Sequence, residues 1–119
     1  LPDNPNRKDG VGETFRHWLI LDRKAARAWI RDQEHEPWLD SAVSVFAKGL
    51  GRRSPVEALG FAQQIHDPKI RRQTVIITAR EWLIRNEASA NEWLAQADLE
   101  EEWLGKIRTI SPGMRKSLR

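Results

Sequence analysis

The sequence predicts an all-α fold of stacked antiparallel helix hairpins, similar to an α-solenoid, with about three units of 32 residues. Ala26, Ala58 and Ala90 fall in register when the chain is shifted along itself by 32 residues. Apolar residues also recur with the spacing of an amphipathic helix, and helix-capping residues precede these stripes. Each unit can bury its apolar face only against its neighbours, so residues 12–110 are expected to form one helical-repeat domain.

The same shift aligns further apolar columns along the chain. They are Trp29, Phe61 and Trp93; Ile30, Ala62 and Leu94; Trp18, Leu50 and Trp82; Phe15, Ala47 and Ala79; and Val43, Val75 and Ile107. Small residues let two helices approach closely, and a large ring beside them fills the remaining space. The columns are therefore expected to form one continuous core.

The two ends of the chain differ from this pattern. Residues 1–11 are rich in Pro, Asn and charge and are expected to be a flexible lead-in. A helix is expected at 12–21, where Phe15 and Trp18 match the second helix of a unit whose first helix is absent. That helix is either an N-terminal cap or part of a longer array. Residues 111–119 begin with Ser-Pro-Gly and are expected to be a basic, mobile tail.

The first helices of the three units are expected at 23–35, 55–66 and 87–97, because the apolar stripe starts there each time. Asp22 and Asn86 are candidate N-caps. Ser54, followed by Pro55 and Glu57, predicts a capping box in which two backbone amides are satisfied reciprocally.

The second helices are expected at 38–50, 68–85 and 99–110. Asp67 before Pro68 is a strong start signal, Glu36 before Pro37 is a weaker copy, and Asp98 is a candidate cap. The helix at 68–85 is apolar on more than one face. It is therefore expected to be the most enclosed helix, in contact with units on both sides.

Composition limits the classes of function. The chain has 119 residues, 20 basic and 17 acidic, with a net charge of +3 and no cysteine, so disulfides and thiol catalysis are excluded. No apolar run approaches the roughly 20 residues that span a bilayer, which predicts a soluble protein. The chain starts at Leu1, and a targeting signal would lie upstream, so the compartment stays open.

No pattern indicates catalysis, a cofactor or a metal. His17, His35 and His66 lack the spacing that places two ligands on one helix face, so surface roles are favoured for them. The acidic run at 100–102 is better explained as helix-start charge than as acid–base machinery. No serine or threonine has a His and Asp arrangement nearby in the sequence. We therefore expect no enzymatic activity.

Two kinds of residue are candidates for partner binding. Trp38 and Trp103 fall outside the 32-residue columns, in the first turn of a second helix, where a ring is easily exposed to a protein partner. Basic residues form the alternative, a flank that binds nucleic acid: they are Arg23, Arg27, Arg31, Arg71 and Arg72, with Arg52, Arg53 and Lys69 nearby. The competing interpretation is a solvated face neutralised by Asp32, Glu57 and Glu81, the last of which is placed to pair with Arg85.

The pattern of an alanine, an aromatic residue three positions later, a capped second helix and a terminal Trp resembles the tandem hairpin repeats of the tetratricopeptide and HEAT-like superfamilies. It is especially similar to Trp-rich bacterial repeats of unassigned function. The resemblance covers about residues 12–110. It implies a stack of antiparallel helix pairs acting as an interaction module.

We thus expect a non-catalytic scaffold that mediates protein–protein interaction or assembly. Nucleic-acid binding along the arginine flank is the alternative, and homo-oligomers formed through the ends of the stack are a further expectation.

Overall fold

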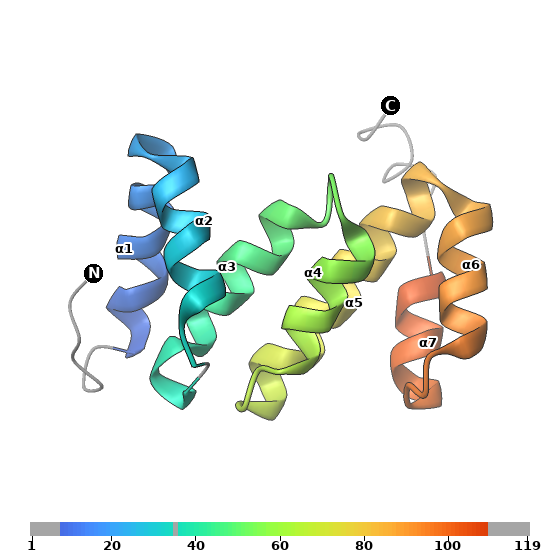
Figure 1. Cartoon of the computed structure of the whole chain (residues 1–119). Coiled ribbons are helices and arrows are strands. Elements are labelled where there is room, and N and C mark those ends of the chain that lie inside the picture. The colour runs from blue at the N-terminus through green and yellow to red at the C-terminus, as the bar shows by residue number, and fades with distance from the viewer. Residues whose placement is uncertain (1–7, 35, 110–119) are drawn as a thin grey trace.

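A computed structural model describes residues 8–34 and 36–109, in which the chain forms seven α-helices, one 3₁₀ helix and no strand (Figure 1). The predicted all-α class is confirmed. The helices are α1 (Lys8–Leu21), α2 (Arg23–Asp32), η2 (Pro37–Leu39), α3 (Asp40–Leu50), α4 (Pro55–Gln63), α5 (Pro68–Arg85), α6 (Glu87–Gln96) and α7 (Glu101–Arg108). Most of the lead-in expected at 1–11, His35 and the expected tail lie outside the described residues.

The helices follow one another along an elongated molecule that measures 40 × 28 × 23 Å. Helix α3 packs against α1 and α5, and α5 packs in turn against α7. Helix α4 contacts both α3 and α5, while α2 contacts α1 and α3, and α6 contacts α5. Figure 1 shows this order from α1 at one end to α6 and α7 at the other. As predicted, α5 has neighbours on both sides. It is not the most enclosed helix, however, because six of its 18 residues are buried, against seven of the 11 residues of α3.

Helix α1 begins at Lys8, earlier than the expected start at residue 12. The reason is Val11, which is only 2% exposed and belongs to the first core cluster with Phe15. Val11 lies 32 residues before Val43. It therefore continues the apolar column of Val43, Val75 and Ile107 into a segment that composition alone assigns to the flexible lead-in.

Three helix starts share one backbone conformation. The N-cap residues of α2, α4 and α6 are Asp22 (φ −152°, ψ 82°), Ser54 (−139°, 74°) and Asn86 (−148°, 83°). Asp22 Oδ1 accepts a hydrogen bond from the Ala25 amide and Asn86 Oδ1 from the Ser89 amide, each at 3.2 Å. These two predicted caps are confirmed, and both satisfy an amide that has no partner inside the helix.

The predicted capping box at Ser54 is wrong. Ser54 occupies the N-cap position and Pro55 follows it in the first turn, but the Ser54 side chain makes no capping hydrogen bond. The Glu57 carboxylate does not reach back either, because it forms an ion pair with the Arg31 guanidinium of α2. Glu57 thus links two helices rather than closing its own first turn.

The second helices start in different ways. Asp67 caps α5 as predicted, with its Oδ1 accepting from the Lys69 amide at 2.9 Å and the Ile70 amide at 3.1 Å. Glu36 precedes η2 instead of capping α3, and its carboxylate accepts from the Trp38 indole at 3.0 Å. Asp98 is not a cap: Glu100 is the N-cap of α7, without a side-chain bond.

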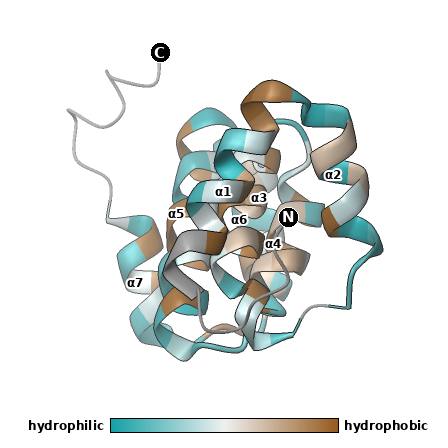
Figure 2. Cartoon of the chain, turned by 90° about the vertical axis from the view of Figure 1, so that its left-hand side faces the viewer, coloured by the Kyte–Doolittle hydropathy of each residue, from teal (hydrophilic) through white to brown (hydrophobic). Residues whose placement is uncertain are grey.

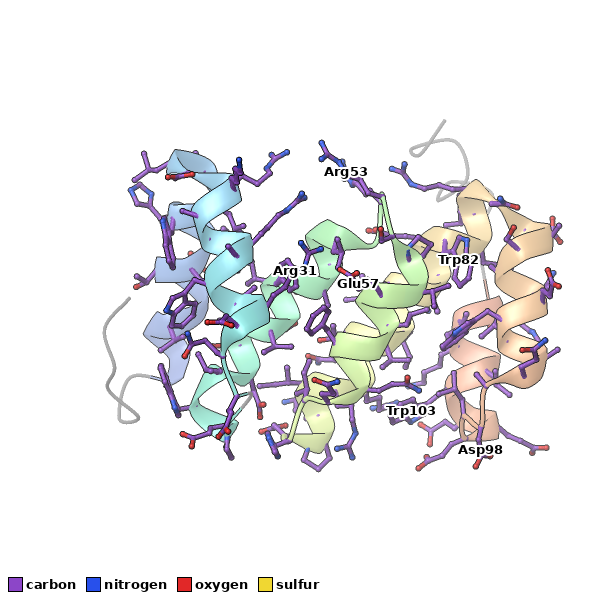
Figure 3. The ribbon with its side chains drawn as sticks, in the orientation of Figure 1. Arg31, Arg53, Glu57, Trp82, Asp98 and Trp103 are labelled. Carbon is purple, nitrogen blue, oxygen red and sulfur yellow. The ribbon has the colours of Figure 1, made fainter. Side chains whose placement is uncertain are left out.

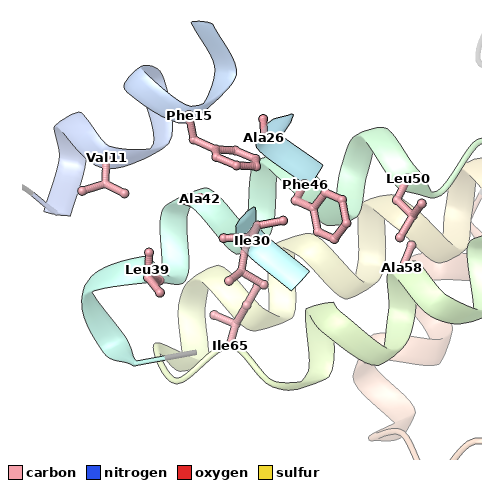
Figure 4. Packing of buried hydrophobic residues seen from close by; sticks show 11 residues of the cluster. Val11, Phe15, Ala26, Ile30, Leu39, Ala42, Phe46, Leu50, Ala58 and Ile65 are labelled. Carbon is pink, nitrogen blue, oxygen red and sulfur yellow. The ribbon is translucent and has the colours of Figure 1, made fainter. Parts of the chain in front are cut away.

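Five of the six aligned columns have the same degree of burial in every copy; in the sixth, Leu50 is buried whereas Trp18 and Trp82 are half-buried. Ala26, Ala58 and Ala90 are all at most 1% exposed, and the columns of Ile30, Phe15 and Val43 are buried in every copy. Trp29, Phe61 and Trp93 are all half-buried. The buried side chains form two clusters, one centred on α1 to α4, which Figure 4 shows, and one on α3 to α7.

Two tryptophan pairs have matching geometry at opposite ends of the molecule. Trp18 of α1 and Trp29 of α2 have ring centroids 5.7 Å apart, with their planes at 56°. Trp82 of α5 and Trp93 of α6 have centroids 6.1 Å apart, with their planes at 53°. Each pair joins the end of one helix to the next helix. Tilted contacts of this kind contribute about 0.5–1.5 kcal/mol beyond the area that they bury.

Candidate functional site

A groove of about 610 Å³ is lined by α1, α2, α3, the turn after α3, and Glu81 of α5. Six basic residues line it: Arg16, Arg23, Arg27, Lys48, Arg52 and Arg53. Glu81 is the one acidic residue in the lining among those that the structure describes. We call this feature the basic groove. Figure 3 shows Arg53 at the tip of the turn between α3 and α4, with its side chain directed away from the ribbon.

Among the described residues, the cations that line the basic groove outnumber the acids. No ion pair in the described part of the chain joins Arg23, Arg27 or Arg53 to a carboxylate, although Arg31 and Arg72 elsewhere are paired. Like charges held close together raise the free energy of the folded chain. The basic groove is therefore a favourable position for an anionic group.

Arg27 carries the clearest electrostatic signature of this crowding. Burial of the side chain lowers the pKa of Arg27, and repulsion from Arg53, Arg23 and Arg31 lowers it further. Each of these effects disfavours the charged form of the guanidinium. An anion bound in the groove would stabilise the charged guanidinium and so raise the pKa of Arg27.

The other component of the lining is aliphatic. Leu19, Ile20, Val45 and Leu50 line the groove together with Phe46, whose ring is 1% exposed. Ile20 is 75% exposed, and the adjacent Leu21 is 70% exposed. Figure 2 shows this apolar end of α1 beside the hydrophilic start of α2. Large exposed aliphatic side chains next to each other are typical of binding surfaces.

A second hollow, of about 450 Å³, continues the basic surface along α2. It shares Arg23, Arg27 and Arg53 with the basic groove and adds Lys24, Ala28 and Arg31. The Arg31 guanidinium is occupied by Glu57 and also lies 5.6 Å from the centre of the Phe46 ring. Figure 3 shows Arg31 and Glu57 facing each other between α2 and α4.

The structure divides the predicted arginine flank into two sets. Arg23, Arg27 and Arg31 lie together on α2, whereas Arg71 and Arg72 line neither of the two hollows. Arg71 donates to the Ile65 carbonyl at 3.0 Å, and Arg72 pairs with Glu102 of α7 at 2.9 Å. The second set thus holds helices together. Glu81 forms no ion pair with Arg85 in the described residues, contrary to the helical spacing.

The two tryptophan candidates lie apart from the basic groove. Trp38 is half-buried against the first core cluster and lines a separate hollow of about 340 Å³ with His66 and Asp67. Trp103 is half-buried against the second cluster, on α7. Both rings are partly accessible, so their role in partner binding stays a prediction. Neither is brought next to the arginines of α2.

Sequence reasoning missed Arg16, Lys48 and Ile20 as groove residues. A signal was present for the first two, because Arg16, Lys48 and Arg80 are 32 residues apart and form a basic column. Ile20 carried no such signal. Its exposure follows from the position of the α1 end relative to α2 and α3, which requires tertiary structure.

In the described residues, no group of three or more His, Asp or Glu side chains is arranged to hold a metal ion. None of the helices described is both long enough and apolar enough to cross a bilayer.

Comparisons of the chain with protein-family models, curated proteins and solved structures found no match.

Proposed function

We propose that this chain is a non-catalytic helical-repeat module that binds a partner protein in the basic groove. The observation that carries the proposal is that arginines without an ion pair line one groove together with the exposed Ile20 and the half-buried Leu19 and Val45. A protein segment satisfies both, because its carboxylates bind arginines while its apolar side chains cover the aliphatic wall.

The repeat architecture belongs to the same proposal. It is supported by the common backbone conformation of Asp22, Ser54 and Asn86, which are 32 residues apart. The matching Trp18–Trp29 and Trp82–Trp93 contacts support it as well. Hairpins stacked in this way, as in the tetratricopeptide and HEAT-like repeats that the sequence resembles, present extended surfaces to partners. The ends of such a stack also favour self-association.

Nucleic-acid binding is the second candidate, favoured by the same cluster of Arg23, Arg27 and Arg53. Phosphates would release counterions from the groove, and affinity would fall steeply with salt. The lining is less suited to this role. Single strands bind on exposed aromatic rings, and among the described residues that line the groove the only aromatic one, Phe46, is buried.

Affinity capture from a nuclease-treated extract of the native cells tests the proposal. The baits are the wild-type chain, the double variant Arg27→Glu/Arg53→Glu, and Arg108→Glu as a control at the far end of the molecule. We expect particular proteins to be retained by the wild type and the control and lost with the double variant. Light scattering of each bait reports self-association.

A parallel capture from an extract without nuclease tests the second candidate: if the wild-type chain retains nucleic acid there, and retains no protein once nuclease is added, nucleic-acid binding replaces the proposal. Equal retention by all three baits would show that the basic groove does not bind the retained proteins. Enzymatic turnover by the purified protein that is lost when a specific acidic residue or histidine is substituted would contradict the non-catalytic assignment.

A further inference from the structure

The geometry points to one class of occupant for the basic groove: an acidic amphipathic segment of a partner protein, with carboxylates on one side and aliphatic side chains on the other. This inference rests on the proposed function and narrows it. It depends on three features of the groove, which are its charge, its exposed aliphatic wall and its size.

The charge of the groove requires an anionic occupant. Arg23, Arg27 and Arg53 have no carboxylate within ion-pair distance in the described residues, and Arg27 is crowded by its neighbours. Arginine binds carboxylates through two parallel hydrogen bonds, which suits Asp or Glu side chains as well as phosphates. Charge alone therefore selects an anion without choosing between protein and nucleic acid.

The aliphatic side chains that line the groove favour a protein partner over nucleic acid. Ile20 presents three quarters of its surface to solvent, and Leu19 and Val45 continue the wall. A phosphate backbone gains nothing from this surface, whereas a Leu or Ile of a partner removes it from water. A segment with carboxylates on one side and aliphatic side chains on the other matches both parts of the groove lining.

The size of the groove limits how much of the partner enters it. Its volume of about 610 Å³ lies in the range of pockets that hold drug-sized ligands. A few side chains of one segment fill this space, so the groove fits a short linear segment rather than the face of a folded domain. Such segments bind with modest affinity and with strong dependence on a few residues.

Fluorescence anisotropy with labelled peptides and the whole chain tests the inference. The probe is a peptide of Glu and Leu with Leu at helical i, i+3, i+4 spacing. The competitors are a scrambled peptide of the same composition, the version with Gln in place of Glu, and an oligouridine RNA. We expect the patterned acidic peptide to bind more tightly than all three.

Matched variants separate the two walls. Ile20→Ser should weaken the patterned peptide about tenfold, because a buried aliphatic contact is lost. Leu21→Ser, similarly exposed but outside the groove lining, should leave affinity unchanged. Arg27→Gln/Arg53→Gln should weaken binding by about tenfold or more at low salt and by less at high salt, whereas Arg108→Gln should not.

Equal binding of patterned and scrambled peptides, or no effect of Ile20→Ser, would overturn the amphipathic occupant. Tighter binding of the RNA, lost in the arginine double variant, would assign the groove to nucleic acid. If no peptide binds while the capture experiment still retains groove-dependent proteins, the inference fails and the proposed function stands.

Discussion

The hydroxyl of Ser44 lies 2.7 Å from the hydroxyl of Thr74, in the buried contact between α3 and α5. Thr74 Oγ1 also lies 2.7 Å from the Ile70 carbonyl, to which it donates its only hydrogen. Ser44 must therefore be the donor to Thr74. The pair is a polar contact between α3 and α5, and its direction determines what each substitution costs.

Thr74→Val should lower the free energy of unfolding by about 2 kcal/mol, because it leaves the buried Ser44 donor without an acceptor. Ser44→Ala should cost about 1 kcal/mol, since Thr74 keeps its bond to Ile70. Urea denaturation of both single variants and the double variant measures the coupling. The double variant should cost less than the sum, and strict additivity would show that the hydroxyls do not interact.

Asp40 stabilises the turn between α4 and α5 from the start of α3. Its carboxylate is 4% exposed and accepts from the His66 amide at 3.0 Å and the Asp67 amide at 2.8 Å. Asp40→Asn offers one acceptor in place of two, and should lower the free energy of unfolding by about 1–3 kcal/mol. Asp32→Asn on the exposed face of α2 is the control, expected within about 0.5 kcal/mol of wild type in the same thermal or urea titration.

Gly51 permits the close approach of α3 to α5. A Cβ at this position would lie 3.0 Å from the Thr78 methyl carbon, whereas a Cβ at Gly60 would meet nothing within 4 Å. Gly51→Ala should therefore destabilise the protein by about 1–2 kcal/mol through overpacking. Gly60→Ala should stabilise it by about 0.5–1 kcal/mol through helix propensity. Thermal denaturation compares the two, and a gain of stability in both would show that the helices can separate without cost.

The crowding of Arg27 predicts a gain of stability when its charge is removed. Folding lowers the pKa of Arg27, so the charged guanidinium costs folding free energy at every pH below that pKa, which includes the whole physiological range. Arg27→Gln should raise the free energy of unfolding by about 0.5 kcal/mol at low salt, and by less at high salt. Urea titrations at two salt concentrations measure this effect, with Arg108→Gln as the control. A loss of stability at low salt would mean that the charges are compensated.

Local signals predicted the helices well. Helix α5 runs from Pro68 to Arg85 as expected, because Asp67 caps its first turn and Pro68 follows at its first position. The error at Val11 arose from weighing local composition above the 32-residue column. The error at Ser54 arose because a glutamate near a helix start can serve either its own helix or a neighbour, and Glu57 pairs with Arg31 of α2.

The groove could be predicted only in part. The spacing of Arg23 and Arg27 on one face of α2 is a local property, so the sequence reveals it. Whether an arginine meets a carboxylate, as Arg72 meets Glu102 from α7, depends on contacts between distant helices. For the same reason the sequence could not distinguish Arg71 and Arg72, which bond to other parts of the chain, from Arg23 and Arg27, which form no ion pair in the described residues.

An NMR titration of the ¹⁵N-labelled chain with the patterned Glu/Leu peptide locates the bound peptide on the protein. We expect the largest amide shifts at the end of α1, the start of α2 and the turn after α3, while the indole signals of Trp38 and Trp103 stay in place. Shifts led by those two indoles, or concentrated on α6 and α7, would contradict binding in the basic groove.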